Sequence, residues 1–169
     1  MKVEYVSTCL LFASIFLLTS CEVNDSDEKD YSQSVSKNGV TVFIKNGTLN
    51  TPGEIKIVNN SSQQMFVPFI LYPYCSFSFY SLAQKNDSVW AGLLYQENKW
   101  IKNTNQDSIV AVCAEYRNPI AINPFQSLKQ KISSVDQQGE FRVAIYFRYS
   151  EIVNPDSPNK EIIINYLVK

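Results

Sequence analysis

The side chains that carry most enzyme chemistry are either missing from this chain of 169 residues or placed where strands are expected to turn. Histidine, the commonest general base and metal ligand near neutral pH, is absent. A Ser-His-Asp arrangement is therefore excluded, and zinc would need an unusual ligand set. The carboxylates beyond residue 30 stand mostly in stretches typical of turns: Asp87, Asp107, Asp136, Glu151 and Asp156. The sequence predicts no enzyme, no metal and no cofactor, and a carboxylate pair that meets only in space is the alternative.

Aromatic residues make up 13% of the chain and are its one enriched class with a binding chemistry. Tyrosine and tryptophan suit sites for sugar rings or peptides because each has an apolar face and a polar edge. Trp100 lies in a polar stretch, and Tyr72 and Tyr74 lie in an expected loop, where binding residues often stand. We therefore predict Tyr72, Tyr74 and Trp100 as candidate ligand-binding residues. Trp90, on an expected strand, is interpreted as a core residue.

An apolar run from Val6 to Leu18 ends just before a cysteine. The run is shorter than the roughly 20 apolar residues of a spanning helix, and it has the length of a secretory signal. Its end, Leu18-Thr19-Ser20-Cys21, resembles the lipobox of bacterial lipoproteins. The resemblance implies removal of residues 1–20, lipid such as palmitate on Cys21, and stable anchoring in the outer membrane of the cell envelope. A secretory signal cleaved nearby by another peptidase is the alternative.

An acidic segment follows the cysteine. Residues 22–30 hold five acids and one lysine, a charge of −4, so we expect residues 21–38 to form a solvated, flexible tether. The acidic run also resembles the surface-export signal of lipoproteins in one large Gram-negative group, and a plain spacer is the alternative. The sequence thus leaves open whether the protein is surface-exposed or faces the periplasm.

Two cysteines remain beyond the signal and the lipidated residue. They form an even pair in a compartment that permits disulfides. A bond between Cys75 and Cys113 would close a loop of 113 − 75 = 38 residues. Such a loop contributes roughly 4 kcal/mol in the chain-entropy model. We predict this disulfide, and two buried thiols are the alternative.

Short runs of alternating apolar and polar residues, separated by turn residues, recur over residues 39–169. Pro68 favours an edge position or a bulge, because proline cannot donate to a strand ladder. The runs predict strands at 40–44, 54–58, 64–70, 75–82, 88–95, 108–114, 119–122, 127–132, 141–147 and 162–168. Many short strands without helical periodicity predict a single all-β domain, an antiparallel β-sandwich.

The run 141–147 shows the expected alternation most clearly. One face should be buried and the other solvated, as an antiparallel sandwich requires. The buried set is Phe141, Val143, Ile145 and Phe147, and the solvated set is Arg142, Ala144, Tyr146 and Arg148.

Four stretches resemble bacterial immunoglobulin-like domains. Residues 55–62 resemble their second strand and turn, and residues 139–143 their Gly-x-Tyr-Arg-Val strand. Residues 119–128 resemble their strand, Pro-Gly turn and polar strand, with Phe125 where glycine is usual, and residues 162–168 resemble the closing strand. The resemblance covers roughly residues 39–169 and implies a sandwich of seven to nine strands. It implies no activity, because this fold hosts many unrelated functions.

Two tripeptides, Asp87-Ser88-Val89 and Asp107-Ser108-Ile109, resemble the O-glycosylation motif of the same Gram-negative group. Both stand in expected turns, so Ser88 and Ser108 are candidate O-glycosylation sites. A turn that enters a strand is the alternative.

The sequence as a whole predicts a lipid-anchored, extracytoplasmic binding or accessory module without catalytic activity. From Tyr31 onward 13 basic and 10 acidic residues give a charge of about +3, too mild for a nucleic-acid surface. One alternative is a surface glycan-binding component of a carbohydrate-uptake system. Another is a protease inhibitor that uses residues 151–160. The membrane is the expected partner through Cys21, and the sequence does not name a protein or glycan partner.

Overall fold

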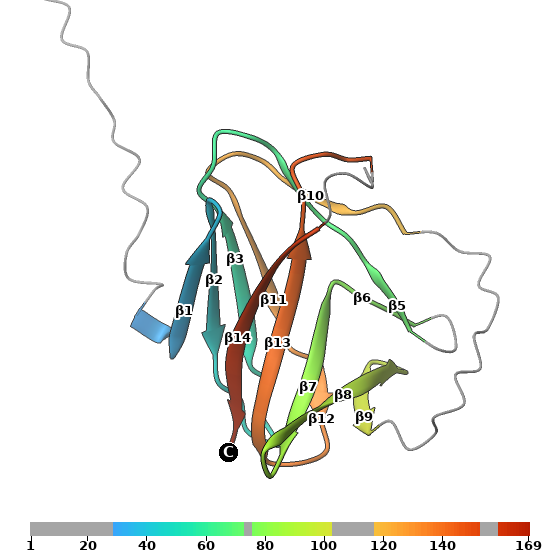
Figure 1. The fold of residues 1–169 in the computed structure, drawn as a ribbon. Coiled ribbons are helices and arrows are strands. Elements are labelled where there is room, and N and C mark those ends of the chain that lie inside the picture. The colour runs from blue at the N-terminus through green and yellow to red at the C-terminus, as the bar shows by residue number, and fades with distance from the viewer. Residues whose placement is uncertain (1–28, 73–75, 103–116, 153–158) are drawn as a thin grey trace, which may run out of the picture.

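Strands dominate the structure, a computed structural model that describes residues 29–72, 76–102, 117–152 and 159–169 (Figure 1). These residues are all-β apart from a short 3₁₀ turn at 29–30, which confirms the predicted fold class. The strands are β1 Gln33–Lys37, β2 Val40–Lys45, β3 Glu54–Asn59, β4 Met65–Val67, β5 Ile70–Tyr72, β6 Ser76–Ser78, β7 Tyr80–Asn86, β8 Val89–Gln96, β9 Lys99–Lys102, β10 Ile120–Ile122, β11 Ser127–Lys131, β12 Ser134–Val135, β13 Gly139–Phe147 and β14 Lys160–Val168.

Two larger sheets form the sandwich. One has four strands in the order β1-β2-β3-β11, and the other has six in the order β12-β9-β8-β7-β13-β14. The strand pairs are antiparallel except β9 and β12, which are parallel. Two small ladders, β4 with β10 and β5 with β6, lie beside them. The described strands exceed the expected seven to nine because several are only two or three residues long, and the immunoglobulin-like strand order stays a prediction.

The core lies between the inward faces of the two larger sheets. The four apolar residues of β13 predicted to be buried, from Phe141 to Phe147, are at most 1% exposed, which confirms their side of the alternation. Full burial of a side chain of this size contributes about 1.5–3 kcal/mol. They pack in one cluster with β2, β3 and β14, whose buried members include Val42, Ile57, Ile164 and Tyr166.

The prediction that Arg148 belongs to a solvated face is wrong; this residue follows directly after β13. Arg148 is only 6% exposed, although a charged side chain in this alternation was expected in water. Its guanidinium donates to the backbone carbonyls of Ser150 (2.7 Å) and Glu151 (2.8 Å). A buried charge is tolerated when it is hydrogen-bonded, and here the loop after β13 supplies the acceptors.

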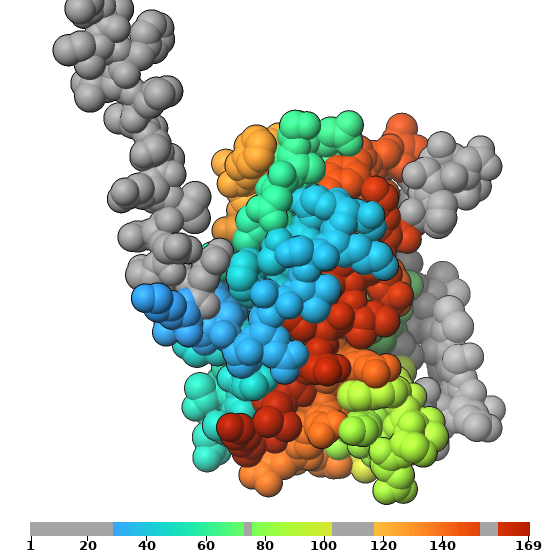
Figure 2. Space-filling model, turned by 60° about the vertical axis from the view of Figure 1, so that its left-hand side comes forward, coloured from blue at the N-terminus to red at the C-terminus, as the bar shows by residue number. Residues whose placement is uncertain are grey.

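Strand β1 lies inside the stretch that the sequence assigned to the tether. Its five residues are all exposed, so no alternation of apolar residues marks it. The backbone ladder with β2 and the Asn38-Gly39 turn, with φ of 52° and 75°, hold it in place. Positive φ at both positions is typical of a two-residue hairpin. Lys37 also donates to the Glu161 carbonyl (3.3 Å), and in Figure 2 the blue and cyan strands lie against the red β14.

Trp90 differs from its predicted core position. It is half-buried near the start of β8, and the guanidinium carbon of Arg142 lies 4.0 Å from the centroid of its ring. Lys85 lies opposite Trp90 across β7 and β8, so the ring has a charged residue on each of its two neighbouring sides, Lys85 and Arg142. Trp90 therefore covers the outer face of the six-stranded sheet. The run 64–70 divides into β4 and β5 around Pro68, and the expected strand 108–114 lies outside the described residues.

Gly47 joins the two larger sheets at the end of the sandwich. Its N–H donates to the Leu167 carbonyl and its own carbonyl accepts from the Lys169 N–H, both at 3.1 Å. A Cβ atom at this position would lie 2.5 Å from the Tyr166 hydroxyl oxygen and 2.7 Å from the Gly53 nitrogen. The close approach of backbone and ring therefore requires glycine.

We expect Gly47→Ala to lower the free energy of unfolding by about 1–3 kcal/mol, because overpacking forces the backbone apart. Gly92→Ala is the matched control, since a Cβ there meets no atom within 4 Å. Its effect should stay within about 0.5 kcal/mol. Urea unfolding measures both, and equal effects of the two substitutions would contradict this account of Gly47.

Candidate functional site

Four aromatic residues from neighbouring strands form the aromatic cluster: Tyr72, Tyr80, Tyr95 and Trp100. The Trp100 ring centroid lies 5.4 Å from that of Tyr72, 5.3 Å from that of Tyr80 and 5.0 Å from that of Tyr95. Trp100 is 1% exposed, so its prediction as an exposed ligand-binding residue is wrong. Its polar neighbours Lys99 and Lys102 are exposed at the two ends of the four-residue strand β9, and only Trp100 between them is buried. Tyr72 is half-buried inside the cluster.

The hydroxyl of Tyr80 connects this cluster to the segment between β11 and β12. It accepts a hydrogen bond from the indole nitrogen of Trp100 (3.2 Å) and one from the backbone N–H of Ser133 (2.9 Å). The Tyr95 hydroxyl donates to Asn98 Oδ1 and shares a hydrogen bond with Ser133 Oγ, both at 3.2 Å. Burial raises the pKa of Tyr80, so its phenol is neutral near pH 7 and remains a hydrogen-bonding group.

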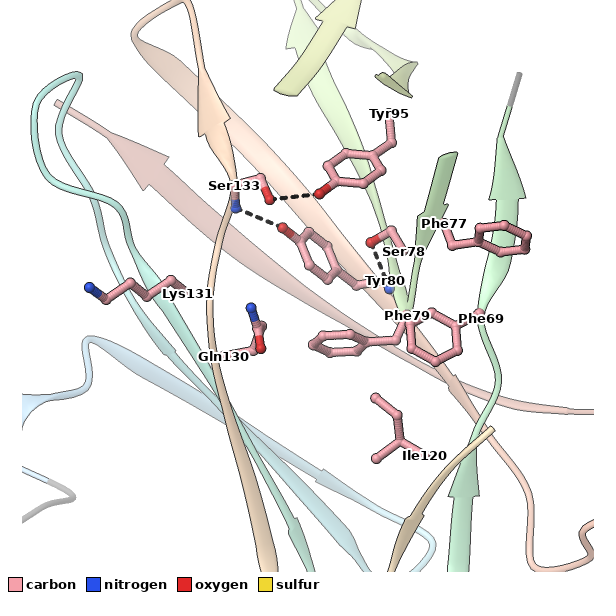
Figure 3. Close-up of a pocket in the computed structure, with 10 residues that line it drawn as sticks. All are labelled: Phe69, Phe77, Ser78, Phe79, Tyr80, Tyr95, Ile120, Gln130, Lys131 and Ser133. Carbon is pink, nitrogen blue, oxygen red and sulfur yellow. Dashed lines mark hydrogen bonds between the residues drawn. The ribbon is translucent and has the colours of Figure 1, made fainter. Parts of the chain in front are cut away.

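A pocket of about 180 Å³ opens beside the cluster, and we call it the aromatic pocket (Figure 3). It is lined by Phe69, Phe77, Ser78, Phe79, Tyr80, Tyr95, Ile120, Gln130, Lys131 and Ser133. In Figure 3 Gln130 stands across from Phe79, and the ammonium of Lys131 points away from the rings. The polar groups that remain beside the rings are therefore neutral hydroxyls and an amide. Pockets for drug-sized ligands measure about 300–1,000 Å³, so this one fits a single ring or side chain.

A second hollow of about 250 Å³ shares Phe77 and Tyr95 with the aromatic pocket. Its other lining residues are Ser76, Glu97, Asn98 and Arg117. The guanidinium carbon of Arg117 lies 5.4 Å from the ring centroid of Phe77. Phe77 and Tyr95 thus separate two hollows. The second hollow has charged and polar residues in its lining, whereas most of the rings line the aromatic pocket.

The other candidates from the sequence divide between an exposed turn and residues that the structure does not describe. Ser88 is exposed in the two-residue turn between β7 and β8, next to Asp87 with φ of 53°, and it stays a candidate O-glycosylation site. The lipidation, disulfide and remaining ligand and glycosylation candidates lie outside the described residues: Cys21, Cys75, Cys113, Tyr74 and Ser108.

Sequence reasoning missed most of the aromatic pocket. Phe79, Ile120 and Gln130 come from three separate segments that meet only in the folded chain. The signal available in the sequence was the run of aromatic residues between Phe77 and Tyr80. That run has the composition of any buried strand, so it did not mark a pocket.

The carboxylates that the structure describes stand apart from this pocket. Asp87, Asp136 and Glu151 are exposed. Within 29–72, 76–102, 117–152 and 159–169, no three His, Cys, Asp or Glu side chains gather as a metal ion would need. The same ranges contain no helix that is long and apolar enough to cross a membrane.

Comparisons with models of protein families, with curated proteins and with solved structures found no match to this chain. The fold and the site therefore define its class by themselves. It is an all-β, sandwich-like protein with an aromatic-lined pocket at one flank.

We expect Tyr80→Phe to lower the free energy of unfolding by about 1–3 kcal/mol, because it leaves two N–H donors without their acceptor. One of these donors is the indole nitrogen of the fully buried Trp100. Tyr95→Phe is the matched control, since the Tyr95 hydroxyl bonds Asn98 at the exposed side of the cluster. Its effect should be below about 1 kcal/mol. Chemical denaturation compares the variants, and a larger loss for Tyr95→Phe would contradict the role assigned to Tyr80.

Proposed function

We propose that this protein is a lipid-anchored, extracytoplasmic binding module without catalytic activity, and that the aromatic pocket is its ligand site. The observation that carries the proposal is the lining of that pocket, where apolar rings surround a few neutral polar groups. Binding sites for small ligands typically combine an apolar lining with a few polar groups that fix orientation. The lipobox-like end of the apolar run supports the anchor, and the strand-rich domain supports a scaffold for binding.

The chemistry of the lining side chains supports binding over catalysis. The phenol of Tyr80 is protonated near neutral pH because burial raises its pKa. Ser78, Gln130 and Ser133 carry no charge, and the ammonium of Lys131 points away from the rings. Such groups donate and accept hydrogen bonds, but a general acid–base reaction needs a group that exchanges its proton near the working pH.

A neutral sugar ring is the ligand that the pocket supports best, which favours the glycan-binding alternative. A sugar has an apolar face for Phe77 or Tyr95, which are half-buried, and hydroxyls for Gln130 and Ser133. The size of the pocket limits the bound group to about one ring. This proposal moves the platform from Trp100, which is buried, to residues that line an opening.

A screen of the mature chain against neutral polysaccharides, followed by titration calorimetry, tests the pocket. Gln130→Trp should weaken binding at least tenfold (about 1.4 kcal/mol), because the larger side chain fills the mouth of the pocket. Ser127→Trp is the matched control, since Ser127 is exposed on the same strand and points to the opposite face.

Equal binding by both variants would move the ligand site elsewhere. Binding to no neutral polysaccharide would contradict the sugar as ligand.

Cell fractionation tests the anchor. We expect Cys21→Ser to abolish labelling with radioactive palmitate and to weaken retention in the outer-membrane fraction, because serine has no thiol for the lipid and stable anchoring needs acyl chains. Cys9→Ser is the control, since Cys9 lies inside the apolar run and should leave with the signal. Palmitate labelling of Cys21→Ser at the level of the unchanged protein would overturn the proposed anchor. Protease treatment of intact cells then distinguishes the outer surface from the periplasm.

A further inference from the structure

Phe125 has no role in the core or in the aromatic pocket, yet it stands in an unusual conformation. It is 73% exposed, and its φ of 59° lies in the left-handed region. The turn that holds it closes with a hydrogen bond from the Gln126 N–H to the Asn123 carbonyl (3.1 Å). Positive φ at the third position of such a turn is usual for glycine and an outlier for a bulky residue.

The surrounding loops hold this turn rigidly. The Phe125 N–H donates to the Asn59 carbonyl (2.8 Å), and the Asn59 N–H donates to the Gln126 carbonyl (3.0 Å). Asn59 is fully buried, and its amide donates to the carbonyls of Gln63 (2.7 Å) and Ile122 (3.0 Å). Strain persists at a residue only where its surroundings fix it in this way, and such residues cluster at functional sites.

Residues 59–64 and 123–126 together form what we call the loop end. Figure 2 shows these segments, green and light orange, side by side at the upper end of the molecule. None of their ten residues is charged, and their side chains are amides, hydroxyls, one proline and Phe125. Interfaces commonly place an aromatic anchor inside a rim of neutral polar groups. The loop end has this layout and shares no lining residue with the aromatic pocket.

We propose that the loop end docks a partner protein, and that Phe125 is the anchor that enters an uncharged, apolar pocket on that partner. A protein fits better than a glycan because the ring stands at the tip of a turn and is open to solvent. The rim amides also bond each other, Gln64 Nε2 to Asn123 Oδ1 (2.7 Å) and Asn123 Nδ2 to Gln126 Oε1 (3.1 Å). Fewer of their hydrogen-bond donors and acceptors are therefore available to sugar hydroxyls. The neutral rim predicts an affinity that depends little on salt.

Site-specific photo-crosslinking in cells tests the docking surface on the full chain. The crosslinking residue p-benzoylphenylalanine replaces Phe125 in one strain and Val89, which is 65% exposed, in a control strain. We expect one protein to be crosslinked from position 125 and not from position 89. That protein is then purified and titrated with the purified chain.

In the titration Phe125→Gly should weaken binding at least tenfold, whereas Val89→Ala should leave it unchanged. Salt between about 50 and 500 mM should change the affinity less than about twofold. Phe125→Gly should also raise the thermal midpoint by about 2–4 °C, because glycine relieves the strained turn, so lost binding would not reflect misfolding.

Four results would overturn the proposal. They are no crosslink from position 125, the same crosslinks from both positions, wild-type affinity of Phe125→Gly for the captured protein, and polysaccharide binding that depends on Phe125. The last would make the loop end a glycan platform.

Discussion

The buried hydroxyl of Tyr80 is the group on which the pocket side of the molecule depends. A buried hydroxyl is tolerated only when it is hydrogen-bonded, and this one accepts from two N–H donors on separate segments. One donor belongs to Trp100 of β9, and the other belongs to Ser133, which follows β11. Through one oxygen the six-stranded sheet is thus tied to the chain that leaves the four-stranded sheet. This connection holds Tyr80 and Ser133 together, and both residues line the aromatic pocket.

The pocket lies where the chain crosses between the sheets. Strand β11 pairs with β3 in the four-stranded sheet, and β12 pairs with β9 in the six-stranded sheet. Only Ile132 and Ser133 separate them. Ile132 is fully buried and its N–H donates to the Gly53 carbonyl (2.9 Å), so the crossing is fixed before it reaches Ser133. Beside this fixed crossing and the short strands lies a hollow that side chains line but do not fill. Ligand sites are usually preformed hollows of this kind.

Local patterns predicted the parts of this fold that have a local cause. The alternation in residues 141–147 predicted the buried face of β13, because a strand has a side-chain period of two. The same logic did not find β1, whose partner is supplied by a hairpin and whose residues are all exposed. It misplaced Trp100 because the rings around it come from other strands. It misplaced Arg148 because the alternation of a strand carries no sign of the loop carbonyls that accept from its buried guanidinium. The residues of the aromatic pocket meet through long-range pairing, so no single stretch of the sequence could mark them.

The non-glycine residues with positive φ fall into two groups. One group stands in hairpin turns that the fold requires, and the other is Phe125, whose exposed ring the fold does not require. Asn38, Asp87 and the Glu97-Asn98 pair stand in two-residue hairpin turns, where positive φ is usual. Asparagine and aspartate tolerate this conformation. Glu97 does so less readily, but like the others it is polar and exposed, so none of the four side chains leaves an apolar surface in water. Phe125 has the same backbone strain and adds an exposed ring, although glycine would remove both. Phe125 alone among the described residues combines positive φ with an exposed apolar side chain, and this combination points to a requirement for that side chain itself.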